Sequence, residues 1–151
     1  MKGNRYFILT FLSIAIGVSL IITGCEETPS SSGSDPVMRA TVDGTTWSAG
    51  NNVDGTVFSQ LKSITGTAGD GSSITLDLEN VTSTGSVDID GGNIKANYIE
   101  GSSTYTAPSG TINITELDAQ NNISGTFSFE GETGAGNPVS VTSGSFSTTL
   151  R

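Results

Sequence analysis

From Val37 onward, apolar and polar residues alternate with a period of two, and no stretch sustains the 3.6-residue period of a helix. The clearest case is residues 74–79, where isoleucine and leucine alternate with threonine and acidic residues. Such alternation predicts strands with one buried and one solvated face. We therefore expect one all-β domain over residues 37–151. It should be an antiparallel meander of about nine or ten strands that forms a barrel or a two-sheet sandwich.

Turn residues divide this region. Turns are expected at Asp43-Gly44, Gly69–Gly71, Gly91-Gly92 and Asp118–Asn121. The pair Gly91-Gly92 predicts a tight hairpin that joins the strands on either side of it. A short strand from Ser103 should stop before Pro108, because proline donates no ladder hydrogen bond.

Between Val141 and Phe146 the apolar positions move from odd to even numbers. One extra residue flips the alternation, so a bulge near Ser143-Gly144 is predicted. A loose motif of glycine, then serine or threonine, then an apolar residue begins at Gly85, Gly110, Gly125 and Gly144. Its spacing is irregular, which argues against a solenoid, and glycine as a strand opener or bulge explains it. The aromatic residues available to a core after residue 25 are Trp47, Phe58, Tyr98, Tyr105, Phe127, Phe129 and Phe146.

The chain begins with a short basic segment that contains Lys2 and Arg5, followed by an apolar run to Ile22. This is the pattern of a secretory signal peptide. The run ends in Ile22-Thr23-Gly24-Cys25, which resembles the lipobox of bacterial lipoproteins. The resemblance implies a diacylglycerol on the Cys25 sulfur, cleavage after Gly24 and acylation of the new amino group.

Three regions are therefore expected: a cleaved signal peptide over 1–24, a lipid anchor and flexible tether over 25–36, and the β domain over 37–151. The tether is rich in serine and poor in apolar residues. The pair Glu26-Glu27 resembles the export signals of Bacteroidetes-type surface lipoproteins, and a plain polar tether explains it equally well. The expected location is the bacterial cell envelope, at the periplasmic or surface face of the outer membrane.

Charge and missing residue types narrow the function. All 15 acidic residues follow Cys25, against four basic ones, so the mature chain carries a net charge of −11. Nucleic acid is not an expected partner, because phosphate binding requires a basic surface. There is no histidine, and Cys25 is the single cysteine. This removes histidine-based catalysis, thiol chemistry and the usual zinc sites, and we expect no enzyme and no cofactor beyond the covalent lipid.

Three oxygen-bearing side chains, Asp88, Asp90 and Asn93, surround the predicted turn at Gly91-Gly92. Calcium takes six to eight oxygen ligands and favours such loops. The spacing is not that of an EF-hand, and a polar hairpin is the favoured interpretation.

Carboxylate pairs such as Glu130/Glu132 and Asp88/Asp90 are weak glycosidase candidates, because neighbours at i, i+2 are usually only solvated.

Trp47, Tyr98 and Tyr105 could form an aromatic platform for a sugar or a peptide. Core packing is the favoured interpretation of all three. Tyr98 shares the parity of the apolar residues Ile94 and Ala96, which leaves Trp47 and Tyr105 as the ligand-binding candidates.

A wider resemblance covers nearly all of the mature domain. Residues 38–47, 110–115, 123–129 and 139–146, in this order, are similar to an uncharacterised family of small Bacteroidetes-type lipoproteins. The resemblance implies an all-β lipoprotein and supplies no activity or catalytic residues.

The expected function is a membrane-anchored, non-enzymatic β domain that binds or stabilises an envelope protein or glycan. The alternative is a small-ligand carrier with a cavity inside a barrel, and a carboxylate hydrolase is a weaker one. An interior filled by Phe127, Phe129, Phe146 and Leu76 would argue against the carrier.

Overall fold

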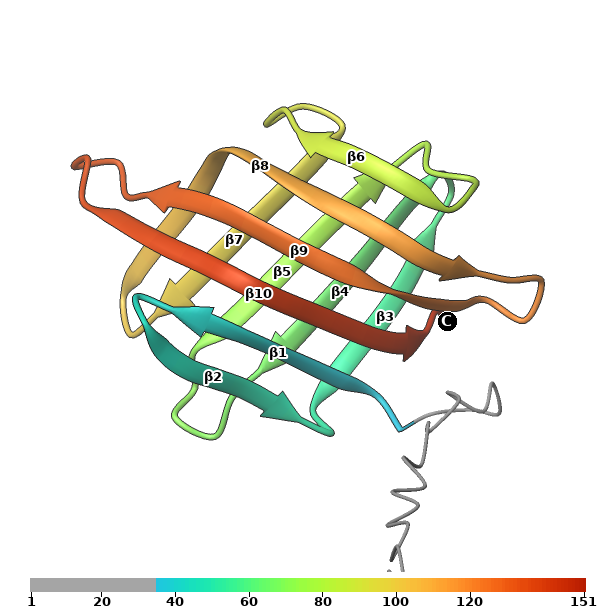
Figure 1. The fold of residues 1–151 in the computed structure, drawn as a ribbon, viewed down its shortest axis with the longest axis horizontal. Helices are drawn as coiled ribbons and strands as arrows, with labels where there is room; N and C mark the ends of the chain where they lie inside the picture. The colour runs from blue at the N-terminus through green and yellow to red at the C-terminus, as the bar shows by residue number, and fades with distance from the viewer. Residues whose placement is uncertain (1–34) are drawn as a thin grey trace, which may run out of the picture. The chain divides into compact units, whose positions relative to one another are not determined.

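The computed structural model describes residues 35–151, which form ten β-strands (Figure 1). Their bounds are β1 Val37–Val42, β2 Thr45–Gly50, β3 Val53–Phe58, β4 Leu61–Thr67, β5 Ser73–Glu79, β6 Gly85–Ile89, β7 Ile94–Glu100, β8 Ser103–Leu117, β9 Asn122–Glu132 and β10 Pro138–Thr149. The predicted all-β class and strand number are confirmed. The expected signal peptide, Cys25 and most of the tether lie outside the described residues. Residues 35–151 contain no helix that is long and apolar enough to cross a membrane.

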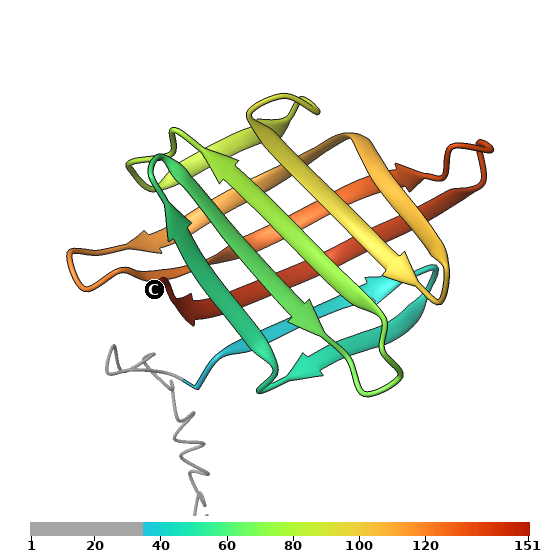
Figure 2. The same cartoon turned by 180° about the vertical axis from the view of Figure 1, so that it is seen from behind.

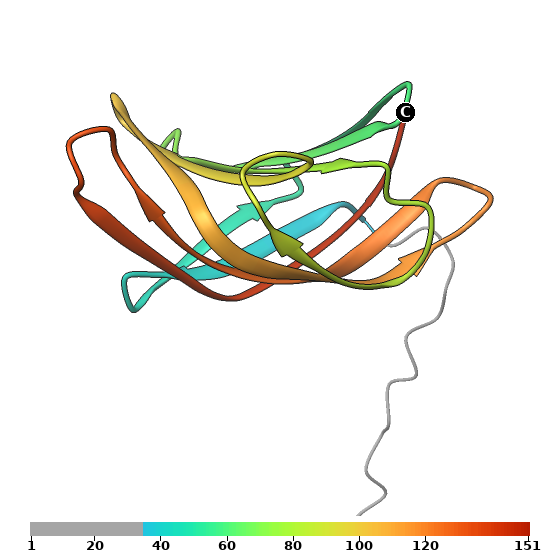
Figure 3. The ribbon, with the colours of Figure 1, turned by 90° about the horizontal axis from the view of Figure 1, so that it is seen from above.

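The strands form two facing layers (Figure 3). The order along the sheet is β2-β1-β10-β9-β8-β7-β5-β4-β3, and β6 pairs with β8 beside this path. β3, β4, β5 and β7 make one layer, which faces the viewer in Figure 2. The long strand β8 belongs to both layers, because Ser103–Thr106 pair with β7 and Gly110–Ile114 pair with β6.

The barrel-like sheet is nearly closed on its other side by the end of the chain. Gly55 in β3 and Leu150 form an isolated parallel bridge. The Val57 amide donates to the Arg151 carbonyl at 2.8 Å, and the Arg151 amide donates to the Gly55 carbonyl at 2.9 Å. The two layers are therefore joined by backbone hydrogen bonds at this edge as well as through β8.

The prediction that a strand stops before Pro108 was wrong. β8 runs without a break through Pro108 to Leu117. Its pairing with β9 shifts register between Thr106 and Ser109, so Pro108 sits in an irregularity where no ladder hydrogen bond is required of it. This irregularity lies where β8 passes from one layer to the other.

The predicted hairpin at Gly91-Gly92 was also wrong in its pairing. The chain does turn there, with the Asp90 and Gly91 amides donating to the Ile94 carbonyl. However, β6 pairs with β8, and β7 pairs with β5 and β8. The turn therefore connects the two layers, and the meander is interrupted at β6.

The interior between the layers is filled by the apolar face of each strand. Phe127, Phe129, Phe146 and Leu76 are all at most 3% exposed, as expected. The ring of Phe127 lies with its centroid 6.3 Å from those of both Phe129 and Phe146. Phe58 does not join this core, because it lies at the end of β3 with 78% of its surface exposed.

The buried phenylalanines lie directly opposite glycines on the neighbouring strands. Phe127 pairs with Gly144, and Phe146 pairs with Gly125. Phe129 likewise pairs with Gly110. A Cβ on Gly144 would lie 2.5 Å from the Phe127 ring, so the glycine provides the space that the ring fills. Three of the four glycines of the motif thus make room for a phenylalanine ring on the neighbouring strand.

The predicted bulge in β10 is confirmed. The pairing of β10 with β9 shifts register between Val141 and Gly144. Ser143, inside the bulge, has a φ of 51°. The extra residue keeps Val141 and Phe146 on the buried face of the same strand, as the change of parity required.

Asp118 organises the turn between β8 and β9. Its Oδ1 accepts hydrogen bonds from the amides of Gln120 and Asn122, and its Oδ2 accepts one from the Asn122 side chain at 2.9 Å. These bonds, that of the Asn122 side chain first, lower the pKa of Asp118 below its ordinary value of 3.8. The charged carboxylate therefore favours the folded state.

A pH-dependent effect of Asp118→Asn follows. A lowered pKa in the folded protein stabilises it above the ordinary pKa, and this contribution is lost as the pH falls through the lowered value. We expect the variant to melt at a lower temperature than the wild type at pH 7, and the difference to vanish on acidification below pH 3.8. Thermal melts of both proteins at a series of pH values test this. A difference that is constant from pH 7 to pH 2 would contradict the role of the charge.

Candidate functional site

A pocket of about 250 Å³ opens at the end of the structure where the β1–β2 turn lies beside the end of β7. Its lining residues are Val42, Asp43, Thr45, Thr46, Trp47, Asp70, Tyr98 and Glu100. The turn is made by Asp43 and Gly44, both with positive φ, which suits the tight hairpin that these residues predict. The pocket is small, so it is suited to a small ligand or one end of a larger one.

Trp47 is held in place by a chain of hydrogen bonds. It lies on the buried face of β2 and is 6% exposed. Its indole N–H donates to Ser72 Oγ at 2.8 Å, and the Ser72 hydroxyl donates to Asp70 Oδ1 at 2.6 Å. The Ser72 amide also donates to Asp70 Oδ1. The hydrogen bond from the Ser72 side chain, followed by that from its amide, lowers the pKa of Asp70, so this carboxyl is charged at neutral pH.

Tyr98 forms the second aromatic wall. It is 4% exposed, and burial, followed by the nearby charge of Glu100, raises the pKa of its phenol. Tyr98 therefore keeps its proton at neutral pH. Tyr105 pairs with Tyr98 across β7 and β8, and the centroids of the two rings are 5.8 Å apart. Tyr105 therefore packs against Tyr98.

The pocket offers hydrogen-bond acceptors and negative charge. Three of its eight lining residues, Asp43, Asp70 and Glu100, carry carboxylates, and none is basic. One oxygen of Asp43 is already used, because it accepts a hydrogen bond from the Ser140 amide at 2.8 Å. The arrangement suits a ligand that donates hydrogen bonds or carries positive charge, placed beside aromatic surface.

Comparison with known proteins places the domain in a family. The family model described as a domain of unknown function (DUF6252) matches residues 34–149. The chain belongs to this family. No curated protein and no solved structure matches it. The match begins three residues before β1 and ends at the last residue of β10, so the DUF6252 domain is the whole barrel-like sheet.

In this DUF6252 domain the two aromatic candidates have different positions. Trp47 lines the end pocket, whereas Tyr105 does not and contacts Tyr98 instead. Tyr98, which the parity assigned to the core, is buried and also lines the pocket. Ser72 and Asp70 were missed, because a Gly-Asp-Gly turn signal gives no indication that its next serine contacts a tryptophan 25 positions earlier.

The calcium candidates are placed around the turn between β6 and β7. Asp88 is exposed on β6 and pairs with Thr111. Asp90 Oδ1 accepts hydrogen bonds from the amides of Ile94 and Gly92, and these bonds, that of Ile94 first, lower the pKa of this carboxyl. Asn93 is exposed in the same turn. Over residues 35–151, no three His, Cys, Asp or Glu side chains gather in a way that could hold a metal ion. Asp90 therefore has a structural role in the turn, and calcium binding stays a prediction.

Of the carboxylate pairs, Glu130/Glu132 lies on a strand surface, and Asp88/Asp90 spans the end of β6 and the turn that follows. Glu130 and Glu132 are both exposed on β9, and Glu130 Oε1 accepts a hydrogen bond from the Ser140 hydroxyl at 2.7 Å. Neither of these two residues lines the end pocket.

Proposed function

We propose that this DUF6252 protein is a lipid-anchored, non-enzymatic binding domain of the bacterial envelope, and that the end pocket beside Trp47 holds its ligand. The pocket is the observation that carries the proposal, because it combines two buried aromatic side chains with three carboxylates. The signal-like segment and Cys25 support the anchor, and the serine-rich composition of residues 25–36 supports a tether between the anchor and the domain.

The charge of the pocket supports a small cationic ligand, such as an amine. Asp43, Asp70 and Glu100 attract positive charge, and the adjacent Trp47 and Tyr98 can contact the apolar part of such a molecule. The hydrogen bonds that hold Trp47 keep this wall in place before any ligand arrives. Preorganisation of this kind lowers the entropic cost of binding.

The packing of the interior favours a binding domain over a small-ligand carrier. The four side chains expected to fill a barrel, Phe127, Phe129, Phe146 and Leu76, are buried, and the Phe127 ring contacts those of Phe129 and Phe146. A carrier would need this space for its ligand.

The anchor is tested by Cys25→Ser. Two or more acyl chains hold a protein on a membrane, whereas a chain without them and with a net charge of −11 has no attraction to anionic lipid. We expect the variant to accumulate as an uncleaved precursor or as a released protein, with no incorporation of labelled palmitate. Membrane fractionation and metabolic labelling report this directly. Normal fractionation with unchanged labelling would overturn the anchor without affecting the pocket.

The pocket is tested by the fluorescence of Trp47, which is the single tryptophan of the chain and lines the site. Titration with spermidine should give a saturable change in emission, and titration with glycerol should not. In Glu100→Gln, one charge is removed, and the apparent affinity for spermidine should fall about fivefold, as expected for a solvated charge pair of about 1 kcal/mol. Glu79→Gln, on the outward face of β5, is the matched control and should bind as the wild type does. Equal weakening in both variants would mean that spermidine binds by net charge alone.

A further inference from the structure

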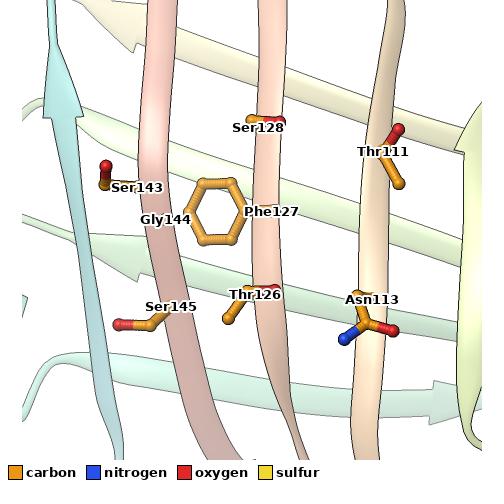
Figure 4. Close-up of a pocket in the computed structure, with 8 residues that line it drawn as sticks. All are labelled: Thr111, Asn113, Thr126, Phe127, Ser128, Ser143, Gly144 and Ser145. Atoms are coloured by element: carbon orange, nitrogen blue, oxygen red, sulfur yellow. The ribbon is translucent and has the colours of Figure 1, made fainter.

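A second hollow lies away from the end pocket, on the outer face of β8, β9 and β10 (Figure 4). Its volume is about 370 Å³, and its lining residues are Thr111, Asn113, Thr126, Phe127, Ser128, Ser143, Gly144 and Ser145. None of these eight residues has a charged side chain. In a chain with a net charge of −9 and only six basic residues, this is a neutral part of the surface lined mainly by hydroxyl groups.

The hollow is the centre of a regular polar array. Across the sheet, the outward residues form a row of paired positions from β6 to β2: Ser86, Asn113, Thr126, Ser145, Arg39 and Ser48. All six are exposed. A neighbouring row contains Asp88, Thr111 and Ser128, then Thr142 in the β10 bulge, Thr41 and Thr46. Adjacent strands lie about 4.8 Å apart, so each row presents polar groups at short, repeated intervals.

The polar side chains of the hollow make no hydrogen bonds with the rest of residues 35–151, whereas several outward side chains elsewhere do. On the outer face of the other layer, Ser63 donates to Asp77 at 2.6 Å, and Thr65 bonds to Thr75 at 3.0 Å. Toward the ends of β9 and β10, Ser124 bonds to Glu116 and Ser140 bonds to Glu130. The donors and acceptors that line the hollow are therefore available to a ligand.

The apolar side chain at the hollow is that of Phe127, which is 3% exposed. Figure 4 shows the Phe127 ring beside Gly144, with hydroxyl side chains on both sides. Because Gly144 has no side chain, the ring packs directly against the backbone of the β10 bulge on the inner side of the sheet. A ligand in this place meets carbon below it and hydroxyl or amide groups around it.

We propose that this face binds a neutral polysaccharide. A sugar chain presents C–H surfaces and many hydroxyl groups that both donate and accept, which matches an apolar floor surrounded by serine, threonine and asparagine. The lack of charge in the hollow, within an acidic chain, favours an uncharged glycan over an anionic one, which the 15 carboxylates would repel. A neighbouring hollow of about 210 Å³ shares Thr111 and Ser128 with it and has one charged lining residue, Glu130. The two together give the site the elongated form that a chain of sugars requires.

The test is affinity electrophoresis of the full-length protein, purified in a polyoxyethylene detergent so that no sugar headgroup competes. Native gels contain dextran, galactomannan or a soluble β-1,3-glucan, and parallel gels contain alginate as an anionic glycan. At least one neutral glycan should retard the wild type, and alginate should not. The variant Asn113→Ala/Thr126→Ala/Ser145→Ala should bind at least tenfold more weakly.

The matched control is Thr56→Ala/Asn97→Ala/Thr104→Ala, which removes the same kinds of side chain from the outer face of the other layer. It should be retarded as the wild type is, and thermal melts confirm that both triple variants are folded. The proposal is overturned if no neutral glycan retards the wild type, if alginate retards it equally, or if the two triple variants lose binding equally. Glu100→Gln should leave retardation unchanged, so a failure at this face is distinct from a failure of the end pocket.

Discussion

Replacing Phe127 with alanine should destabilise the protein by about 3–5 kcal/mol. The side chain is 3% exposed and contacts the rings of Phe129 and Phe146, in the layer that contains β9 and β10. The change removes a large apolar group and leaves a cavity that the surrounding strands cannot close. Chemical denaturation followed by circular dichroism measures the loss of unfolding free energy.

Phe58→Ala is the control for this experiment, because it makes the same chemical change at a side chain that is 78% exposed. Substitutions at such surface positions usually alter stability by no more than about 0.5 kcal/mol. A loss below 1 kcal/mol for Phe127→Ala, or equal losses at the two positions, would mean that the burial of Phe127 does not stabilise the fold.

The second large effect is expected where a side chain is added. In Gly144→Ala the new methyl group would lie 2.5 Å from two carbons of the Phe127 ring, which is too close for van der Waals contact. The ring and the β10 backbone must move, and overpacking of this kind typically costs about 1–3 kcal/mol. Gly134→Ala is the matched control, because its Cβ would meet nothing within 4 Å, and it should be neutral or slightly stabilising.

A compensating substitution identifies the cause. In a Phe127→Leu background the smaller side chain leaves room at position 144, so Gly144→Ala should cost less than in the wild type. Residues in direct contact commonly show couplings of about 0.5–3 kcal/mol. Additive effects of the two changes would show that steric conflict with the ring is not the reason.

The strands of this fold could be predicted from the sequence better than the pairing between them. Alternation identifies which residues of a strand are buried, and the parity change at Val141 even located the bulge in β10. It contains no information about which strand lies alongside. The turn at Gly91-Gly92 therefore suggested a hairpin, although β6 completes its hydrogen bonds with β8. Pro108 was expected to end its strand because a regular ladder requires a hydrogen bond from every second residue. The pairing of β8 with β9 is irregular at this point, so the strand continues through the proline.

The candidate sites were harder to predict, because they depend on distant residues. Trp47 was a candidate by residue type, but its contact with Ser72 results from β2 lying near the loop between β4 and β5. Nothing in the sequence favoured Trp47 over Tyr105 as a ligand-binding residue. Only the pairing of β7 with β8 shows that Tyr105 packs against Tyr98. The hydroxyl-lined hollow has no local signal, since every strand of residues 35–151 except β7 contains serine or threonine.

The order of pairing also has a consequence for biosynthesis. β1 is the first strand to be made, yet Val42 pairs with Val141, and the turn residue Asp43 bonds to Ser140, 97 positions later. Until β10 is synthesised, β1 has only β2 beside it, and an isolated two-stranded hairpin is marginally stable at best. Ribosomes add about 5–20 residues per second, so this part of the chain waits several seconds for its partner. Folding of this part of the sheet is therefore delayed until most of the polypeptide exists.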